Sequence, residues 1–326
     1  MTRASIYSII SGLLATLFAS GALAKPIELT AAHVNPPGEP CYEAFKLMSE
    51  KLKAGKTEIT LKVFPQGQVG DEKDAIEQVK MGALTMTCVA NANLSSFAPS
   101  IGIYDTPFLF RDGDKHPWIV TDGPIGAKIT QKAEQESGLD ILGWWSAGLR
   151  HVFSKNKDVK TPEDMKDMKI RVIGSPVYVD TFNQLGAKPV PMPYGEVYTG
   201  LATGTLDAAE NDTSGYRNMK FYEQAPHLSL TGHVFLMKPV VANAAALEKM
   251  SPEQRAEFDS IFKQATQHQR DLFATTFTKD IQWAKEHGVT VTEPDRAAFE
   301  QKVKPIQEKI ARQYGEELLQ SIKDAK

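Results

Sequence analysis

The sequence has few cysteines, no excess of positive charge, and none of the common nucleotide-binding or hydrolase signatures. Cys41 and Cys88 are its only two cysteines, and neither belongs to a CxxC pair or a Cys/His cluster, which argues against zinc and redox motifs. Phosphate-loop, dinucleotide, H-E-x-x-H and G-x-S-x-G motifs are absent as well. A net charge of −3, with both signs interspersed, disfavours nucleic acid and anionic membranes as partners.

The histidines do not form a metal site in the sequence. Seven are present, and none stands at metal-ligand spacing from another; they are at positions 33, 116, 151, 227, 233, 268 and 287. We therefore expect no metal, no cofactor and no catalysis. A triad assembled from distant residues would leave no motif, so an enzyme stays an alternative that no residue pattern favours.

The first 24 residues are typical of an export signal. One cation, Arg3, precedes an apolar stretch that ends in Ala22-Leu23-Ala24, the small-x-small pattern of a cleavage site. A membrane anchor is the alternative, but Ser and Gly interrupt the run, which is short against the roughly 20 residues of a span. We predict a signal peptide over 1–24 and a mature, soluble chain in the periplasm.

The two cysteines allow two interpretations in that compartment. An oxidising environment permits a Cys41–Cys88 bridge, and both residues also suit being buried as small hydrophobic side chains. The sequence leaves both open.

Short apolar runs alternate with amphipathic segments through most of the chain. Such alternation predicts the α/β class, with mostly parallel sheets flanked by helices. The first series has strands over 27–33, 57–65 and 85–91, with helices over 42–55 and 72–82.

A second series begins near Gly148 and predicts a second lobe of similar size. The apolar run 228–242 is longer than one ordinary strand and is expected to cross between the lobes. Ser251-Pro252-Glu253 starts a long helix, and another runs from Asp295 to near the end. We assign 25–148 and about 237–276 to lobe 1, and 149–236 and about 277–326 to lobe 2, with a ligand cleft between them.

Arg171 stands out because it lies inside "MKIRVIG", a run that otherwise reads as a buried strand. An unpaired buried guanidinium costs several kcal/mol, so Arg171 needs an anion. Asp207 or Glu210 could supply it internally, or the carboxylate of a small organic acid could bind its planar fork. Arg150, at the junction of the lobes, is a second cation near the same cleft.

With these residues in view, the chain resembles solute-binding proteins of TRAP (tripartite ATP-independent periplasmic) transporters that bind dicarboxylates and sugar acids. The resemblance covers essentially the whole mature chain and rests on an ordered set of motifs: "FPQGQVGDEKDAIEQVKMGAL", "DTPFLFRD", "TPEDMKDMKIRV", "FNQLGAKPVPMPYGEVYTGLATGTLDAAEN" and "KFYEQAPHLSLTGH". It implies a two-lobed periplasmic binding protein fold.

The resemblance also implies roles for particular residues. The arginine of the family's "K-[IL]-R-V" strand, which clamps the ligand carboxylate, falls on Arg171, and a second family arginine falls on Arg150. The family's asparagine after "D-G-x-E" falls on Asn211, and its cleft aromatic falls on Tyr194. For Tyr194 the structural alternative is an aromatic at a helix start.

Departures from the family pattern bear on the ligand. Positions that carry charged or amide groups in sialic-acid-binding members hold Ala90, Asn93 and Gly174 here, which disfavours sialate. Amides and an imidazole near the first and third strands suit the hydroxyls of a small polyol acid, with loop capping as the alternative for asparagine. These candidates are His33, Asn35, Asn91 and Asn93.

The resemblance therefore implies a monomeric extracytoplasmic receptor that closes around a small organic acid and delivers it to TRAP transporter membrane subunits. A uronate or aldonate is favoured. The alternatives are a C4-dicarboxylate or other carboxylate, a binding protein that serves a sensor, and a periplasmic sugar-acid enzyme.

Overall fold

The fold is built on one continuous sheet. A computed structural model describes residues 25–110 and 115–326, so the predicted signal peptide lies outside the described residues. Within that part of the chain, nine strands pair in the order β2-β1-β3-β8-β4-β7-β5-β6, with β9 paired to β8. The strands are β1 Ile27–Ala32, β2 Ile59–Phe64, β3 Met86–Cys88, β4 Asp140–Ser154, β5 Lys169–Val172, β6 Lys188–Pro191, β7 Ala208–Asn211, β8 His227–Ala242 and β9 Thr290–Thr292.

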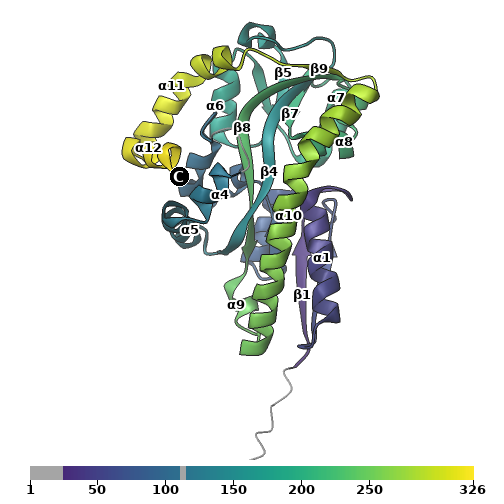
Figure 1. Cartoon of the computed structure of the whole chain (residues 1–326), viewed down its shortest axis with the longest axis vertical. Coiled ribbons are helices and arrows are strands. Elements are labelled where there is room, and N and C mark those ends of the chain that lie inside the picture. Colours follow the sequence, from purple (N-terminus) through teal and green to yellow (C-terminus); the bar gives the residue numbers. More distant parts are fainter. Residues whose placement is uncertain (1–24, 111–114) are drawn as a thin grey trace, which may run out of the picture.

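The sheet is mixed and has two parallel groups joined by two long strands. β1 pairs in parallel with β2 and β3, and β5 pairs in parallel with β6 and β7. Between these groups, β4 and β8 run side by side through the centre of the molecule (Figure 1), and the β3·β8, β8·β4 and β4·β7 pairs are antiparallel. The α/β alternation is thus as predicted, while the two parallel groups belong to one sheet.

Strand β4 departs from the sequence prediction at Gly148. The sequence predicts that a second strand-helix series begins near Gly148, but residues 140–154 form one strand. Gly148 has φ of +64°, a left-handed conformation that glycine adopts without a steric penalty, and the register with β8 shifts between Ser146 and Gly148. A β-bulge therefore carries the strand through this point instead of ending it. The long strand predicted over 228–242 is β8.

The described residues form twelve α-helices and four short 3-10 helices. The α-helices are α1 Pro40–Ala54, α2 Glu72–Lys80, α3 Asn91–Leu94, α4 His116–Thr121, α5 Pro124–Ser137, α6 Pro176–Gln184, α7 Val197–Ala202, α8 Thr213–Asn218, α9 Ala244–Leu247, α10 Pro252–Glu286, α11 Arg296–Tyr314 and α12 Glu316–Asp324. The 3-10 helices are η1 Pro99–Asp105, η2 Pro162–Met165, η3 Tyr194–Glu196 and η4 Phe221–Glu223.

Helix α10 runs along the length of the sheet beside α1 and over β4 (Figure 1). Its start follows the predicted signal: the hydroxyl of Ser251 accepts from the N–H of Gln254, whose side chain accepts from the N–H of Ser251, and Pro252 is the first helical residue. Although α10 has 35 residues, no helix in the described ranges combines the length and apolar character needed to cross a bilayer.

Both faces of the sheet are buried under helices. Neighbouring residues of a strand point to opposite faces, and Trp144 and Trp145 of β4 illustrate this. Trp144 packs in the cluster that contains Tyr104 and Phe235, whereas Trp145 packs on the α1 side against Phe45. Both faces are thus filled with apolar side chains, and the candidate site lies at the edge where strands of both parallel groups end.

Candidate functional site

The candidate site is a pocket at the carboxyl ends of strands from both parallel groups. Asn35 follows β1, Ala90 follows β3, Ile173 follows β5 and Asn211 ends β7, and all four line the pocket. The pocket holds about 520 Å³ of space not filled by atoms, part of it open to solvent. Its lining is Asn35, Glu39, Pro40, Cys41, Glu72, Ala90, Asn93, Ser146, Ala147, Arg150, Arg171, Ile173, Tyr194, Asn211, Asp212, Leu236, Lys238 and Phe273.

Arg171 lies in β5 with its side chain buried in the pocket wall. Its Nε donates to the carbonyl of Met192 at 2.9 Å, which fixes the plane of the guanidinium. The nearest carboxylate oxygen, on Glu210, is 3.9 Å from Nη1, beyond hydrogen-bond distance. Burial lowers the pKa of Arg171; the charge of Glu210 opposes this effect, and the neighbouring Arg150 adds to it.

Glu210 is bound to Arg150 instead. Arg150 donates from Nε to one oxygen of Glu210 and from Nη2 to the other at 2.9 Å, and Nη2 also donates to the Glu210 carbonyl at 2.7 Å. Burial alone would lower the pKa of Arg150, but the ion pair outweighs it and raises this pKa. Burial would likewise raise the pKa of Glu210, and Arg150 overrides it and lowers that pKa to about 2. Both groups stay charged.

Asp207 and Glu210, the two possible internal partners of Arg171, thus make their closest contacts with other residues. Glu210 makes its close bonds to Arg150, and the carboxylate of Asp207 accepts from the backbone N–H of Lys169 at 2.9 Å. Of the two buried arginines beside Glu210, Arg150 has a close carboxylate partner and Arg171 does not.

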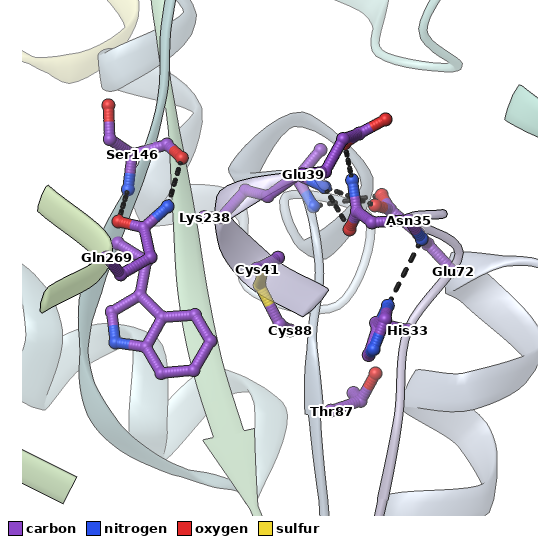
Figure 2. The surroundings of a disulfide bond; sticks show 12 residues. His33, Asn35, Glu39, Cys41, Glu72, Thr87, Cys88, Ser146, Lys238 and Gln269 are labelled. Carbon is purple, nitrogen blue, oxygen red and sulfur yellow. Dashed lines mark hydrogen bonds and ion pairs between the residues drawn. A yellow bond between two sulfur atoms is a disulfide. The ribbon is translucent and has the colours of Figure 1, made fainter. Parts of the chain in front are cut away.

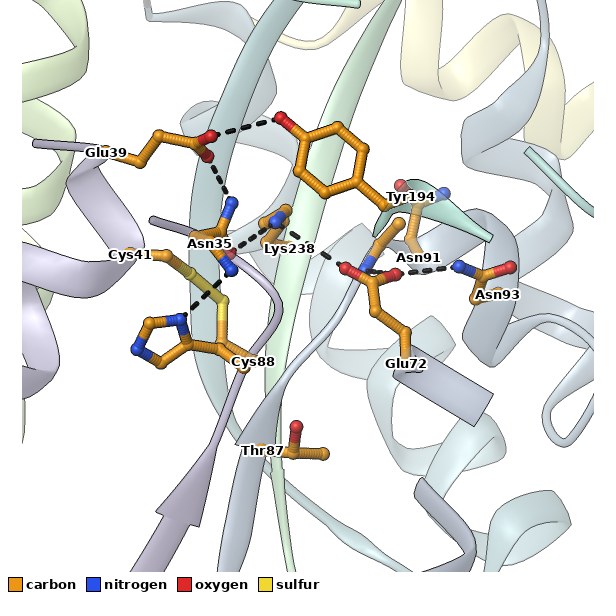
Figure 3. Close-up of polar contacts among 12 residues, drawn as sticks. Asn35, Glu39, Cys41, Glu72, Thr87, Cys88, Asn91, Asn93, Tyr194 and Lys238 are labelled. Atoms are coloured by element: carbon orange, nitrogen blue, oxygen red, sulfur yellow. Dashed lines mark hydrogen bonds and ion pairs between the residues drawn. A yellow bond between two sulfur atoms is a disulfide. The ribbon is translucent and has the colours of Figure 1, made fainter. Parts of the chain in front are cut away.

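A chain of hydrogen bonds connects Arg150 to the loop after β1. Nη1 of Arg150 donates to Asn211 at 2.7 Å, Asn211 donates to the Tyr194 hydroxyl at 3.1 Å, and that hydroxyl donates to Glu39 at 3.0 Å. Glu39 also accepts from the Asn35 amide (Figure 3). Burial raises the pKa of Glu39, and the charge of Asp212 adds to this effect. Three predicted residues, Asn35, Asn211 and Tyr194, thus lie together at the pocket.

Lys238 and Glu72 form a second polar group in the pocket lining. The Lys238 ammonium donates to the Asn35 side-chain oxygen at 2.8 Å and lies 3.6 Å from Glu72 (Figure 3). The other Glu72 oxygen accepts from the Asn93 amide at 2.7 Å and from the N–H of Ala90 at 2.9 Å. Asn93 therefore lies at the pocket, and no described residue donates a hydrogen bond to its side-chain oxygen.

Two predicted residues are placed away from the lining. His33 is buried beside Tyr42 and Phe45, its Nδ1 accepts from the N–H of Asn35 at 3.2 Å, and burial lowers its pKa to about 3. Asn91 donates to Asp105 at 2.7 Å and accepts from the N–H of Met237 at 3.2 Å, so both ends of its amide have partners inside the protein. Both residues support the loops behind the pocket.

Cys41 and Cys88 form a disulfide, which decides the alternative that the sequence left open. The bridge ties the start of α1 to the end of β3 (Figure 2). Cys41 itself lines the pocket. Glu39 and Asn35 are carried by the segment just before Cys41, and Ala90 follows Cys88. The disulfide therefore holds two pocket loops together.

Several lining residues were not singled out from the sequence. Lys238 lies in the apolar run "HVFLMKPVVA" and carries the same signal as Arg171, a cation in a buried strand. Glu72 and Glu39 stand at helix starts, where a carboxylate has an ordinary structural reason to be. Phe273 belongs to an amphipathic helix remote in sequence, and no local pattern marks it.

The chain matches the family described as "Bacterial extracellular solute-binding protein, family 7" over residues 31–313. It is 38% identical over 254 residues to the 2,3-diketo-L-gulonate-binding periplasmic protein YiaO of Escherichia coli, and the aligned region covers 78% of this chain and 76% of that protein.

Solved structures agree with the fold. A TRAP periplasmic solute binding protein from Citrobacter koseri with bound D-glucuronate superposes with a TM-score of 0.86 at 33% identity, over 92% of this chain and 100% of that one. The sugar acid binding protein DctPAm from Advenella mimigardefordensis in complex with galactonate gives a TM-score of 0.88 at 28% identity, over 92% and 98% of the two chains.

These similarities confirm the periplasmic binding protein fold, with its mixed sheet and long C-terminal helix, and the periplasmic location inferred from the sequence. The family consists of binding proteins and not of enzymes. The chain belongs to this family of bacterial extracellular solute-binding proteins, the DctP-type receptors of TRAP transporters.

Proposed function

We propose that the pocket binds a small sugar acid, a uronate or an aldonate, through a carboxylate clamp on Arg171, and that the protein delivers this ligand to a TRAP membrane complex. The observation that carries the proposal is the state of Arg171. It is buried in the pocket wall, and neither terminal nitrogen donates a hydrogen bond to any described residue. A ligand carboxylate on the open edge of the fork would supply the missing acceptors.

The surrounding groups suit a polyol. Asn35, Asn93, Tyr194 and Asn211 place amide and hydroxyl groups on the pocket, and each can donate or accept. Similar proteins with bound D-glucuronate and galactonate support the same ligand class. Besides the two arginines, Lys238 is the other lysine or arginine cation of the pocket lining, and it is already bonded to Asn35 and close to Glu72, which favours a ligand with one acid group.

Two contacts across the pocket support a closure of the lobes around the ligand. The segments assigned above to lobe 1 and lobe 2 meet where Tyr194 donates to Glu39 and where the Lys73 ammonium donates to the Gly174 carbonyl at 3.4 Å. We propose that these bonds break when the lobes open and re-form when a ligand bridges them, so that the membrane subunits meet a closed receptor.

Isothermal titration calorimetry with the purified mature chain tests the proposal. The panel is D-glucuronate, D-galacturonate, D-galactonate and succinate, with D-galactose as the match that lacks a carboxylate. At least one sugar acid is expected to bind, and D-galactose is not. Preference for succinate would reassign the protein to C4-dicarboxylates.

The clamp is tested by Arg171→Met, which keeps the buried volume but removes the cation. The ligand carboxylate would then be buried without a partner, so affinity should fall about 100-fold or more. Arg255→Met is the matched control, because Arg255 is half-exposed on α10 and pairs with Asp259 away from the pocket. Affinity within a few-fold of the parent in Arg171→Met would show that Arg171 is not the clamp.

A further inference from the structure

Part of the pocket lining is apolar. Ala147 of β4 and Leu236 of β8 contribute to this part, and Phe273 of α10 adds an aromatic ring that is only partly buried by the protein. The clamp mechanism makes no use of this ring. Aromatic rings are strong recognition elements because they offer a large rigid apolar face at a low entropy cost.

The position of Phe273 is fixed by the backbone beneath it. A Cβ atom on Gly148 would lie 1.9 Å from Cε1 of Phe273, so the ring rests directly on the glycine of the β4 bulge. One helical turn earlier, the buried Gln269 accepts from the N–H of Ser146 at 2.8 Å and donates to the carbonyl of Ser146 at 2.7 Å (Figure 2). α10 is thus joined to β4 beside the ring, and the bulge lies two residues before Arg150.

This arrangement matches one form of sugar acid better than the other. A pyranose ring presents hydroxyls around its edge and C–H bonds on its faces, whereas an open-chain acid has no fixed apolar face. With its carboxylate on Arg171 and its hydroxyls toward Asn35 and Lys238, a cyclic acid can lay a C–H face on an aromatic wall. A cyclic ligand also loses fewer rotatable bonds on binding.

We infer that Phe273 is a specificity-determining residue that selects cyclic hexuronates over open-chain aldonates. The inference rests on the proposed sugar-acid function and adds the ring form of the ligand to it. Arg171 binds the carboxylate common to both classes, and Phe273 distinguishes between them.

The test compares D-galacturonate with D-galactonate, which have the same number of carbons and one carboxylate each, by calorimetry on the mature chain. Phe273→Leu keeps an apolar side chain but removes the aromatic face. We expect it to weaken D-galacturonate binding about five- to tenfold and D-galactonate binding less than about twofold. Phe273→Tyr keeps the face and should restore the parent's ratio of affinities.

Phe277→Leu is the matched control one turn further along α10. Phe277 is 38% exposed, packs near the His151 ring and does not line the pocket, so this variant should leave both affinities unchanged. Equal losses for the two acids in Phe273→Leu, or the same selective loss in Phe277→Leu, would overturn the inference while leaving the sugar-acid function standing. A parent that binds none of the three sugar acids of the calorimetry panel would overturn both.

Discussion

Asp105 gives the sharpest prediction that can be made without a ligand. Its carboxyl group is fully buried at the end of η1, where it accepts hydrogen bonds from the Asn91 amide at 2.7 Å and the Ser175 hydroxyl at 2.8 Å. Burial raises its pKa to about 7, although both hydrogen bonds act in the opposite direction. Because Ser175 closely follows the strand that carries Arg171, this contact also supports the pocket wall.

The sign and size of the effect follow from proton linkage. The pKa of Asp105 is 3.8 without the protein environment and about 7 in the folded chain, so between these values the native state binds more protons than the unfolded state. The free energy of unfolding should therefore fall as pH rises through this range and level off above it. For this one group the total loss is about 4 kcal/mol.

Asp105→Asn should remove this loss, because asparagine does not ionise. Its side-chain oxygen can accept from Asn91, and its amide can donate to the hydroxyl of Ser175. We expect the variant to be close to the parent in stability near pH 4 and more stable by up to about 4 kcal/mol near pH 8.

Urea unfolding followed by tryptophan fluorescence at several pH values measures this difference. Asp259→Asn is the control, because Asp259 lies on the surface and pairs with Arg255. The difference in free energy of unfolding between this variant and the parent should hardly change with pH. If the stability difference between Asp105→Asn and the parent were the same at about pH 5 and about pH 8, the reasoning from burial would be refuted.

Two further predictions concern the frame of the pocket, and both are measured by urea unfolding without ligand. Arg150→Met should lower the free energy of unfolding by about 3 to 5 kcal/mol, because Glu210 would keep a buried charge without its close partner. Adding Glu210→Gln to this variant should recover part of the loss. A loss of stability no larger than that of Arg171→Met would contradict the assignment of Arg150 as the internal partner of Glu210. Replacing Cys41 and Cys88 with alanine should cost about 4 kcal/mol, given the sequence separation of 47 residues, and a variant as stable as the parent would show that the bridge does not constrain the unfolded chain.

The sequence by itself determined the α/β class and the long elements. Apolar periodicity marks β8 and α10 because a strand or helix buried on a continuous face must repeat its apolar residues at the period of its backbone. The same rule exposed Arg171, since a permanent cation in an apolar strand requires a partner. The ordered motifs around it identified the family, and Asn35, Asn93, Tyr194 and Asn211 do lie at the pocket with the two arginines.

Only the tertiary structure decided how those residues share their contacts. Arg150 and Arg171 look alike in sequence, yet Glu210 bonds closely to Arg150 and leaves the terminal nitrogens of Arg171 directed to no described acceptor. His33 was predicted at the site but does not line the pocket. Phe273 does line it, and its ring packs on Gly148, which lies more than a hundred residues earlier in the chain. Pairing depends on distances of a few ångströms between strands remote in sequence, and local periodicity carries no information about those distances.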